Sequence, residues 1–418
     1  MTVLKRNTWR FMNTRLPVIG VLVCSAIMAA SAGQWTYDSA NGLLSHDSSG
    51  WVLTASRDGT NLTVTGIQTE PGTPSALPLN DPVPEHALVR IGPWAFEYCS
   101  ALTGVTILDS VLSIGNGAFL HCENLDVVSI GTGVTRIEGY AFYDCASLLS
   151  FDVAPGNTHY ASYEGVLYDK TFSQLIQCPA GWTGGITIPD SVLAIGDEAF
   201  SSCSGLTDVT IPDSVLSIGD SAFYSCGNLG TVTIGNGVTR IGYGAFYNCD
   251  ALTLLVIPAQ VRWLGYYMLG DCATLNSVTF EGDYPAEGVK GEFYSWGSIA
   301  VTSYVYAAHA ASWEPHVQDG PLTNGQAVWQ ACPIRVLANP GSYLTVTLDK
   351  RGGAFLGPTS KTVIYGNAYG SLPAPTRAGH VFDGWWTGIN GGGMSVFPMS
   401  RVILTTELFT CFASNLTI

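Results

Sequence analysis

Hydrophobic and polar residues repeat with a fixed period of 23 residues over the middle of the chain. The stretches IGDEAFSSC, IGDSAFYSC and IGYGAFYNC begin 23 residues apart. A gap of 58 residues between two of the units indicates an insertion. A fixed period of about 20–50 residues is typical of solenoids. The units start at Ile91, Ile114, Ile137, Ile195, Ile218, Ile241 and Leu264.

Each unit follows the pattern I-G-x-x-A-F-x-x-C-x-x-L-x-x-V-x-I-x-x-x-V. Apolar residues four and three apart within 199–206 predict one face of a short helical turn. The alternating pair Val209 and Ile211 predicts a strand, and the Pro-Asp-Ser stretch after it predicts a turn. One unit cannot bury its apolar side alone. Stacked units can, because each strand pairs with the next at about 4.8 Å.

The repeated residues resemble BspA-like leucine-rich repeats over residues 87–285, with a degenerate insertion at 154–185. The inserted stretch EGVLYDK…LIQCPAG also resembles an insertion common in that family. The resemblance implies a leucine-rich repeat solenoid with a short helix or turn and one parallel strand per 23-residue coil. It also implies a non-catalytic protein of the bacterial surface that binds a partner.

Two flanking regions depart from the repeat. Residues 33–86 alternate apolar and polar positions between frequent turns, which predicts an N-terminal β cap. Residues 286–341 are interpreted as degenerate terminal coils and a linker, because the 23-residue pattern weakens there.

Residues 342–418 resemble the internalin-type B repeat, also called the Listeria–Bacteroides repeat, which implies a small β-grasp domain. That family closes with a tyrosine and a tryptophan, where this chain has LFTCF at 408–412. The two adjacent tryptophans are interpreted as including a core residue, with carbohydrate stacking as the alternative. The matching residues are Val346, Leu348, Asp349, Gly352, Gly353, Tyr365, Gly366, Leu372, Pro373, Pro375, Thr376, Gly379, Phe382, Gly384, Trp385 and Trp386.

The N-terminus has the pattern of a signal peptide over residues 1–32. Four basic residues precede the apolar run 16–30, and Ala-Ser-Ala follows at its end. A membrane anchor is the alternative, although the run is short for a span of about 20 residues. Met12 is an alternative start, and Val23 disfavours lipidation of Cys24. We therefore expect an exported protein, secreted or at the cell surface, without a transmembrane span in the mature chain.

The charge balance narrows the possible partners. Of the residues, 47% are hydrophobic and 12% charged, and the formal net charge is −15. A nucleic-acid or anionic-membrane binder needs a basic face, which this composition disfavours. A protein or glycan at a cell or matrix surface is the expected partner, and the sequence predicts no oligomeric state.

Periodic cysteines raise the question of metal or disulfide chemistry. Zinc needs about four converging ligands, whereas one thiol per coil gives a row. Stacked coils bring Cα atoms close enough for bridges, but parallel side chains suit the disulfide dihedral poorly. We interpret these cysteines as small buried core residues. Cys178, Cys332 and Cys411 lie off the row, and their pairing stays open. The periodic cysteines are Cys99, Cys122, Cys145, Cys203, Cys226, Cys249 and Cys272.

No sequence motif indicates catalysis or a cofactor. The chain lacks H-E-x-x-H, G-x-S-x-G and P-loop patterns, and its seven histidines are scattered. We expect an adhesin-like binding protein. The alternative is a structural spacer of the cell envelope, and an enzyme with a site in the cap or in 281–340 is a third hypothesis.

Two sets of residues are candidates for partner binding. The first is the row expected to point outward from the strands, which a solvated sheet would also explain. The second is the group of tyrosines after the Ala-Phe pair, which also suits a wet rim of the core. The strand row is Thr106, Ser129, Asp152, Thr210, Thr233, Val256 and Thr279, and the tyrosines are Tyr98, Tyr143, Tyr224 and Tyr247.

Overall fold

The structure is a computed structural model that describes residues 34–287, apart from 48, 74 and 80–82, together with residues 301–318 and 322. Beyond residue 327 it describes strands only, and it includes side chains there only for 334–337. The predicted signal peptide, Cys24 and the side chains of Cys332 and Cys411 lie outside the described residues.

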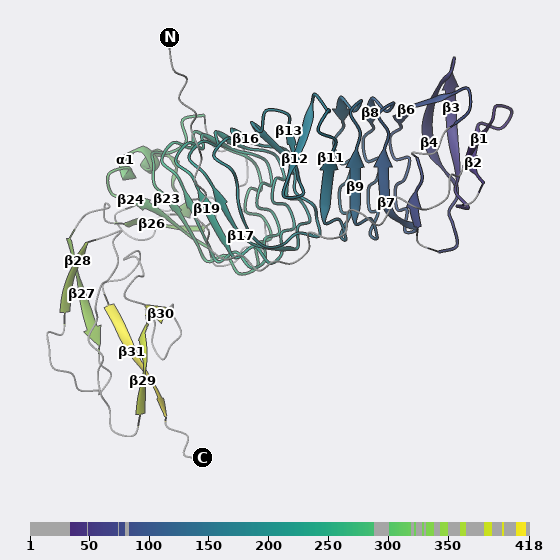
Figure 1. Cartoon of the computed structure of the whole chain (residues 1–418). Helices are drawn as coiled ribbons and strands as arrows, with labels where there is room; N and C mark the ends of the chain where they lie inside the picture. Colours follow the sequence, from purple (N-terminus) through teal and green to yellow (C-terminus); the bar gives the residue numbers. More distant parts are fainter. Residues whose placement is uncertain are drawn as a thin grey trace, which may run out of the picture.

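The repeats stack as the coils of a solenoid (Figure 1). Each coil contributes a short strand at its Ile-Gly pair and a longer strand at its V-x-I segment. On either side of the insertion both kinds pair in parallel with the next coil, except that the longer strands at 231–234 and 254–257 belong to separate sheets. Ile195, for example, lies opposite Ile218, and Val209 lies opposite Val232. The short strands are β6 (Ala87–Ile91), β8 (Ser113–Ile114), β10 (Arg136–Ile137), β16 (Ala194–Ile195), β18 (Ser217–Ile218), β20 (Arg240–Ile241) and β22 (Trp263–Leu264). The longer strands are β5 (Ser75–Leu77), β7 (Leu102–Ile107), β9 (Val127–Ile130), β11 (Ser150–Val153), β15 (Thr183–Thr187), β17 (Gly205–Ile211), β19 (Thr231–Ile234), β21 (Leu254–Ile257) and β23 (Ser277–Phe280).

Other elements continue the ladders at both ends of the solenoid. Four antiparallel strands precede the short-strand ladder, and the last of them, β4, pairs in parallel with β6. At the far end β23, β24 and β26 extend the long-strand ladder in parallel, with a short helix between the last two. These elements are β1 (Trp35–Asp38), β2 (Leu43–His46), β3 (Val52–Asp58), β4 (Asn61–Thr69), β24 (Thr302–Tyr306), α1 (Ala310–Trp313), the 3-10 turn η1 (Glu314–His316), β25 (Val328–Trp329) and β26 (Cys332–Leu337).

The ten residues after each unit start run from the short strand to two residues past the cysteine, and we call these segments together the turn edge. The sequence predicts a short helical turn here, but the structure has a series of tight turns. The reason is that two residues in each segment have positive φ, such as Glu198 (58°) and Ser202 (61°), which interrupts a right-handed helix. Backbone N–H groups of Glu198, Phe200 and Ser202 therefore donate to carbonyls of the next coil at 2.7–2.9 Å.

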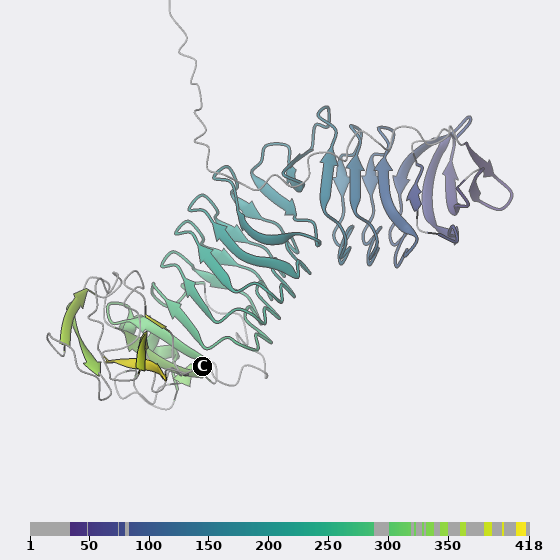
Figure 2. The ribbon, with the colours of Figure 1, turned by 60° about the horizontal axis from the view of Figure 1, so that its bottom comes forward.

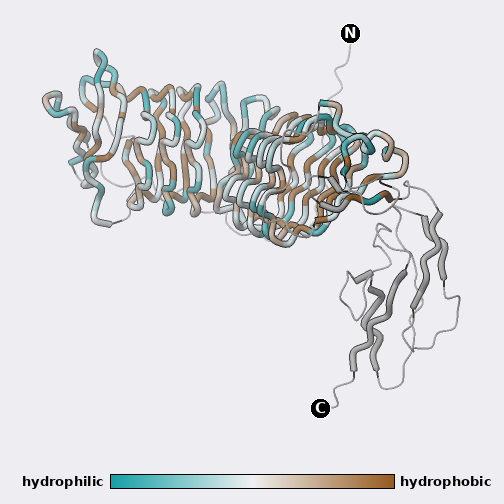
Figure 3. Tube along the Cα trace, turned by 180° about the vertical axis from the view of Figure 1, so that it is seen from behind, coloured by the Kyte–Doolittle hydropathy of each residue, from teal (hydrophilic) through white to brown (hydrophobic). Residues whose placement is uncertain are grey.

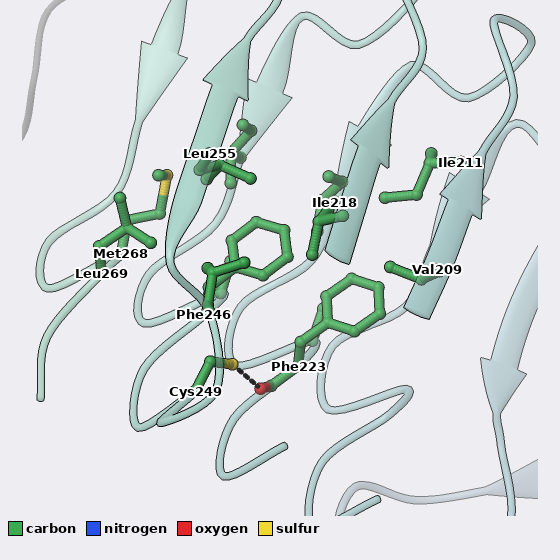
Figure 4. Packing of buried hydrophobic residues seen from close by; sticks show 14 of the residues in the cluster. Val209, Ile211, Ile218, Phe223, Phe246, Cys249, Leu255, Met268 and Leu269 are labelled. Carbon is green, nitrogen blue, oxygen red and sulfur yellow. Dashed lines mark hydrogen bonds between the residues drawn. The ribbon is translucent and has the colours of Figure 1, made fainter. Parts of the chain in front are cut away.

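Phenylalanine and cysteine ladders fill the core behind the turn edge. The rings of Phe200, Phe223 and Phe246 stack on one another at 4.7 and 5.1 Å between centroids. The Cys249 thiol donates to the Phe223 carbonyl at 3.2 Å (Figure 4). The thiols of four other cysteines donate to a phenylalanine carbonyl in the same way at 3.0–3.2 Å, namely Cys122, Cys145, Cys226 and Cys272. In Figure 3 hydrophobic stretches recur along successive coils, as the period predicts.

The insertion divides the solenoid into two hydrophobic cores. It contains three antiparallel strands, β12 (Tyr160–Tyr163), β13 (Val166–Asp169) and β14 (Gln174–Gln177). Within β13, Leu167 belongs to the N-terminal core, whereas Val166 and Tyr168 belong to the C-terminal core. The stack of coils changes direction near this boundary, in the blue-green part of Figure 2.

A separate mixed sheet forms beyond residue 342. Its strand order is β28-β27-β31-β29-β30, with β27 and β31 parallel and the other pairs antiparallel. The LFTCF stretch lies in β31, at the position expected for the last strand. The β-grasp fold of this region stays a prediction. The strands are β27 (Tyr343–Asp349), β28 (Ser360–Ile364), β29 (His380–Trp386), β30 (Ser395–Val396) and β31 (Glu407–Ser414).

The burial of the cysteines predicts how their thiols react with alkylating reagents. All eight cysteines with described side chains are unpaired and buried. Burial raises the pKa of the Cys226 and Cys249 thiols well above its usual range and that of Cys272 to about 12. Because all eight sulfurs are buried, we expect their alkylation to be very slow in the native protein. After unfolding without reductant, mass spectrometry should show at least eight alkylated cysteines. Fewer than eight would mean that at least one of these eight buried cysteines forms a disulfide.

Candidate functional site

The outward row of the strands is a polar face of small side chains. Thr106, Asp152, Thr210 and Thr233 are exposed, and Ser129 and Val256 are half-buried. These residues lie on neighbouring strands in register, with no aromatic ring among them. Such a row suits a solvated sheet.

Thr279 does not belong to that exposed row, contrary to the prediction. Its exposed fraction is 7%, and it lies opposite Tyr304 of β24. The sequence pattern fades after residue 285, so the pairing of β24 with β23 could not be predicted, and neither could the burial of this threonine.

All four predicted tyrosines lie on the turn edge. Tyr98 is the most exposed of them, with an exposed fraction of 65%, and Tyr143, Tyr224 and Tyr247 are half-buried. The structure adds aromatic residues that the sequence analysis missed. They occupy the second and third positions after the unit start, which vary between coils, so only their spacing from the Ile-Gly pair could have indicated them. The added residues are Trp94, Tyr140, Tyr243, Tyr266 and Tyr267.

The first group of rings, which we call the N-terminal aromatic patch, consists of Trp94, Tyr98, His121, Tyr140 and Tyr143. Tyr98 stacks on His121 with 4.7 Å between ring centroids, and Tyr143 meets His121 edge-on at 6.1 Å. Tyr140 and Tyr143 are 5.6 Å apart. Consecutive coils thus hold their rings against one another.

A close contact with a carboxylate holds the histidine of this patch. His121 Nδ1 lies 2.8 Å from a carboxylate oxygen of Asp144 on the next coil. The ring that stacks on Tyr98 is therefore held from both sides, which fixes its orientation.

Trp94 owes its position to a glycine on the next coil. A Cβ atom added to Gly117 would lie 2.2 Å from the Trp94 ring, so the indole lies directly over this backbone. Gly117 also has a φ of 60°, which disfavours residues with a side chain. Trp94 is nevertheless half open to solvent, with an exposed fraction of 47%.

The second group, the C-terminal aromatic patch, consists of Tyr224, Tyr243, Tyr247, Tyr266 and Tyr267. Tyr224 and Tyr247 stack at 5.3 Å, nearly parallel at 8°. Tyr267 contacts Tyr243 edge-on at 6.1 Å and Tyr266 at 6.4 Å. Five rings therefore cover three consecutive coils.

A carboxylate raises the pKa of one tyrosine in each patch. The Tyr247 hydroxyl donates to Asp271 on the next coil, and this bond raises the pKa of Tyr247 to about 12. Interaction with the Glu198 carboxylate likewise raises the pKa of Tyr140 to about 12. Burial raises the pKa of the Glu198 carboxyl. Tyr140 and Glu198 lie on opposite sides of the insertion in the sequence.

Charges are segregated on the coils. The turn edge carries no lysine or arginine, whereas Arg90, Arg136, Arg240 and Arg262 lie in or beside the short strands. The edge therefore has a negative field around its aromatic rings. Its acidic residues are Glu97, Glu123, Glu138, Asp144, Asp197, Glu198, Asp220, Asp250 and Asp271.

Neither a metal cluster nor a membrane helix is found in the part of the chain that the structure describes. Within it, no group of three or more histidine, cysteine, aspartate or glutamate side chains could hold a metal ion. None of the helices over the same residues is long and apolar enough to cross a membrane.

Comparison with known families agrees with this geometry. Residues 80–175 and 183–285 match a model described as BspA type leucine rich repeat region, in six copies. The repeat region of this chain is of the BspA leucine-rich repeat type. Residues 344–408 match the Listeria-Bacteroides repeat domain, so the chain combines BspA-type repeats with a segment of the second family that the sequence resembles.

Solved structures include similar leucine-rich repeat proteins. The pneumococcal vaccine antigen PcpA is 17% identical, with a TM-score of 0.47, over 71% of this chain and 99% of its own. A protein from Eubacterium ventriosum is 23% identical, with a TM-score of 0.44, over 64% and 83%. One from Bacteroides ovatus is 18% identical, with a TM-score of 0.38, over 69% and 77%. No curated protein matches the chain significantly.

Because Trp94 lies over Gly117, alanine substitutions at two equivalent glycines should destabilise the protein by different amounts. Gly117→Ala and Gly244→Ala both place a side chain at positive φ, which costs roughly 1 kcal/mol or more. Only the first also pushes against a ring, since a Cβ at Gly244 has its nearest contact at 3.6 Å. We expect urea unfolding to show an additional loss of about 1–3 kcal/mol for Gly117→Ala.

A double-mutant cycle isolates that contact. In a Trp94→Ala background the cost of Gly117→Ala should fall to that of Gly244→Ala. If the cost is unchanged, Trp94 does not lie over Gly117.

Proposed function

We propose that this is a non-catalytic, exported protein, secreted or at the cell surface, that binds a protein or glycan partner through the turn edge of its solenoid. The observation that carries the proposal is the exposure of the aromatic rings. Trp94 and Tyr98 expose 47% and 65% of their surface, and Tyr140, Tyr243 and Tyr266 each expose 46%. Tyrosine and tryptophan are enriched in the centres of interfaces.

The backbone beneath the rings supports the same proposal. Turn-edge N–H groups are bonded to the next coil, and neighbouring rings contact one another across coils. A surface fixed before binding loses little conformational entropy when the partner docks. Long solenoids present such surfaces over many coils.

Export and surface location rest on other grounds. The first 32 residues have the pattern of a signal peptide. This pattern supports a protein that acts outside the cytoplasm.

A structural spacer of the cell envelope is the second candidate. The observation in its favour is the strand row, where Thr106, Thr210 and Thr233 present small polar side chains without an aromatic or strongly charged centre. This face offers little for specific binding, so a binding function depends on the turn edge.

Binding by the full chain to immobilised matrix proteins and glycans tests the proposal. We expect at least one ligand whose affinity falls at least tenfold in a triple variant, Tyr98→Ser, Tyr243→Ser and Tyr266→Ser, since losses of about 2 kcal/mol are typical of interface centres. A matched strand variant, Thr106→Ala, Thr210→Ala and Thr233→Ala, should stay within twofold. Equal or greater loss in the strand variant would contradict the turn edge as the binding surface. Absence of binding would favour the spacer.

A further inference from the structure

The C-terminal aromatic patch has a composition that selects its partner. Its five tyrosines cover the coils that start at residues 218, 241 and 264, and both Tyr243 and Tyr266 are about half exposed. Rings that lie both parallel and edge-on present π faces as well as hydroxyl groups to a partner.

Carboxylates lie among these rings at fixed positions. Asp220 accepts the Tyr243 N–H at 2.9 Å, and Asp250 accepts the Ala273 N–H at 3.3 Å. Asp271 accepts the Tyr247 hydroxyl. Each acid is thus tied to a neighbouring coil, and its negative charge is held on the same three coils as the tyrosines.

Cations are missing from the same surface. The three coils of the patch contain no lysine, arginine or histidine over residues 219–228, 242–251 and 265–274. The N-terminal aromatic patch differs, because His121 there already pairs with Asp144. Over residues 34–287 the chain has 26 acidic and six basic residues, so the wider field has the same sign.

We propose that the C-terminal aromatic patch docks a lysine- or arginine-rich segment of a partner protein. The inference rests on the proposed function and specifies its partner. Ammonium and guanidinium groups are attracted to tyrosine faces, and guanidinium also forms paired hydrogen bonds with carboxylates. An anionic partner meets only repulsion, and a neutral one gains nothing from the net charge.

Fluorescence anisotropy with labelled peptides tests this on the full chain. The probes are ten-residue oligo-arginine and oligo-lysine, with oligo-glutamate and a Gly/Ser peptide as controls. We expect the cationic peptides alone to bind, and to bind more weakly as salt rises from about 50 to 200 mM, because screening shortens the range of charge attraction. Equal binding of the Gly/Ser peptide or preference for oligo-glutamate would overturn the proposal.

Two variants separate the patch from the general negative field. Asp220→Asn, Asp250→Asn and Asp271→Asn remove three charges and keep an acceptor oxygen for each hydrogen bond. Asp109→Asn, Asp190→Asn and Asp213→Asn remove the same charge at turns away from the turn edge. We expect at least tenfold weaker binding of oligo-arginine for the first set and less than threefold for the second. Tyr243→Ser with Tyr266→Ser should also weaken binding at least tenfold. Equal losses for the two aspartate sets would mean attraction by net charge alone.

The outcome also separates this inference from the proposed function. If a matrix ligand depends on Tyr98, Tyr243 and Tyr266 while cationic peptides do not bind, the inference fails and the binding function stands. If neither the ligands nor the peptides bind, both fail.

Discussion

The structure depends on how backbone N–H groups at the turn edge find their partners. A 23-residue coil must reverse direction between its short and long strands while it bonds to the next coil. Two residues of positive φ in each turn segment, such as Ser221 and Ser225, turn the N–H groups of Ser221, Phe223 and Ser225 toward the following coil. An α-helix would use those N–H groups in its own hydrogen bonds, so neighbouring helices would contact one another through side chains alone. The turns instead bond to the next coil through their backbone.

The hydrogen bonds between successive turn segments explain why the units of this chain keep the same shape. Because the coils are held at a constant spacing, Phe200, Phe223 and Phe246 stack, and each buries a large apolar ring. The cysteine fits beneath them, since the Cys226 thiol reaches the Phe200 carbonyl at 3.0 Å. The cysteine therefore fills the core and adds a weak hydrogen bond. The same spacing between coils also sets the distances between the exposed tyrosines on the outer side.

The sequence predicts what the 23-residue period encodes directly. Parallel strands, the buried cysteines and the outward direction of Thr210 and Thr233 follow from it. The spacing of Ala199, Cys203 and Leu206 also fits a helix, and only the backbone angles of the structure distinguish the two conformations. Thr279 is buried by a strand outside the regular pattern, and rings such as Tyr243 were missed because they occupy positions without a period. The contacts of these residues form between coils, so the sequence of a single unit cannot indicate them.

The proposed binding function depends on a rigid turn edge, because the backbone that holds the exposed rings is hydrogen-bonded to the next coil. Amide hydrogen exchange of the full chain tests that claim most directly. We expect the N–H groups of Phe200, Phe223 and Phe246 to exchange as slowly as that of Val232 in the strand ladder, since each is bonded to a neighbouring coil. Exchange of the three phenylalanine amides as fast as in exposed loops would contradict a preformed binding edge.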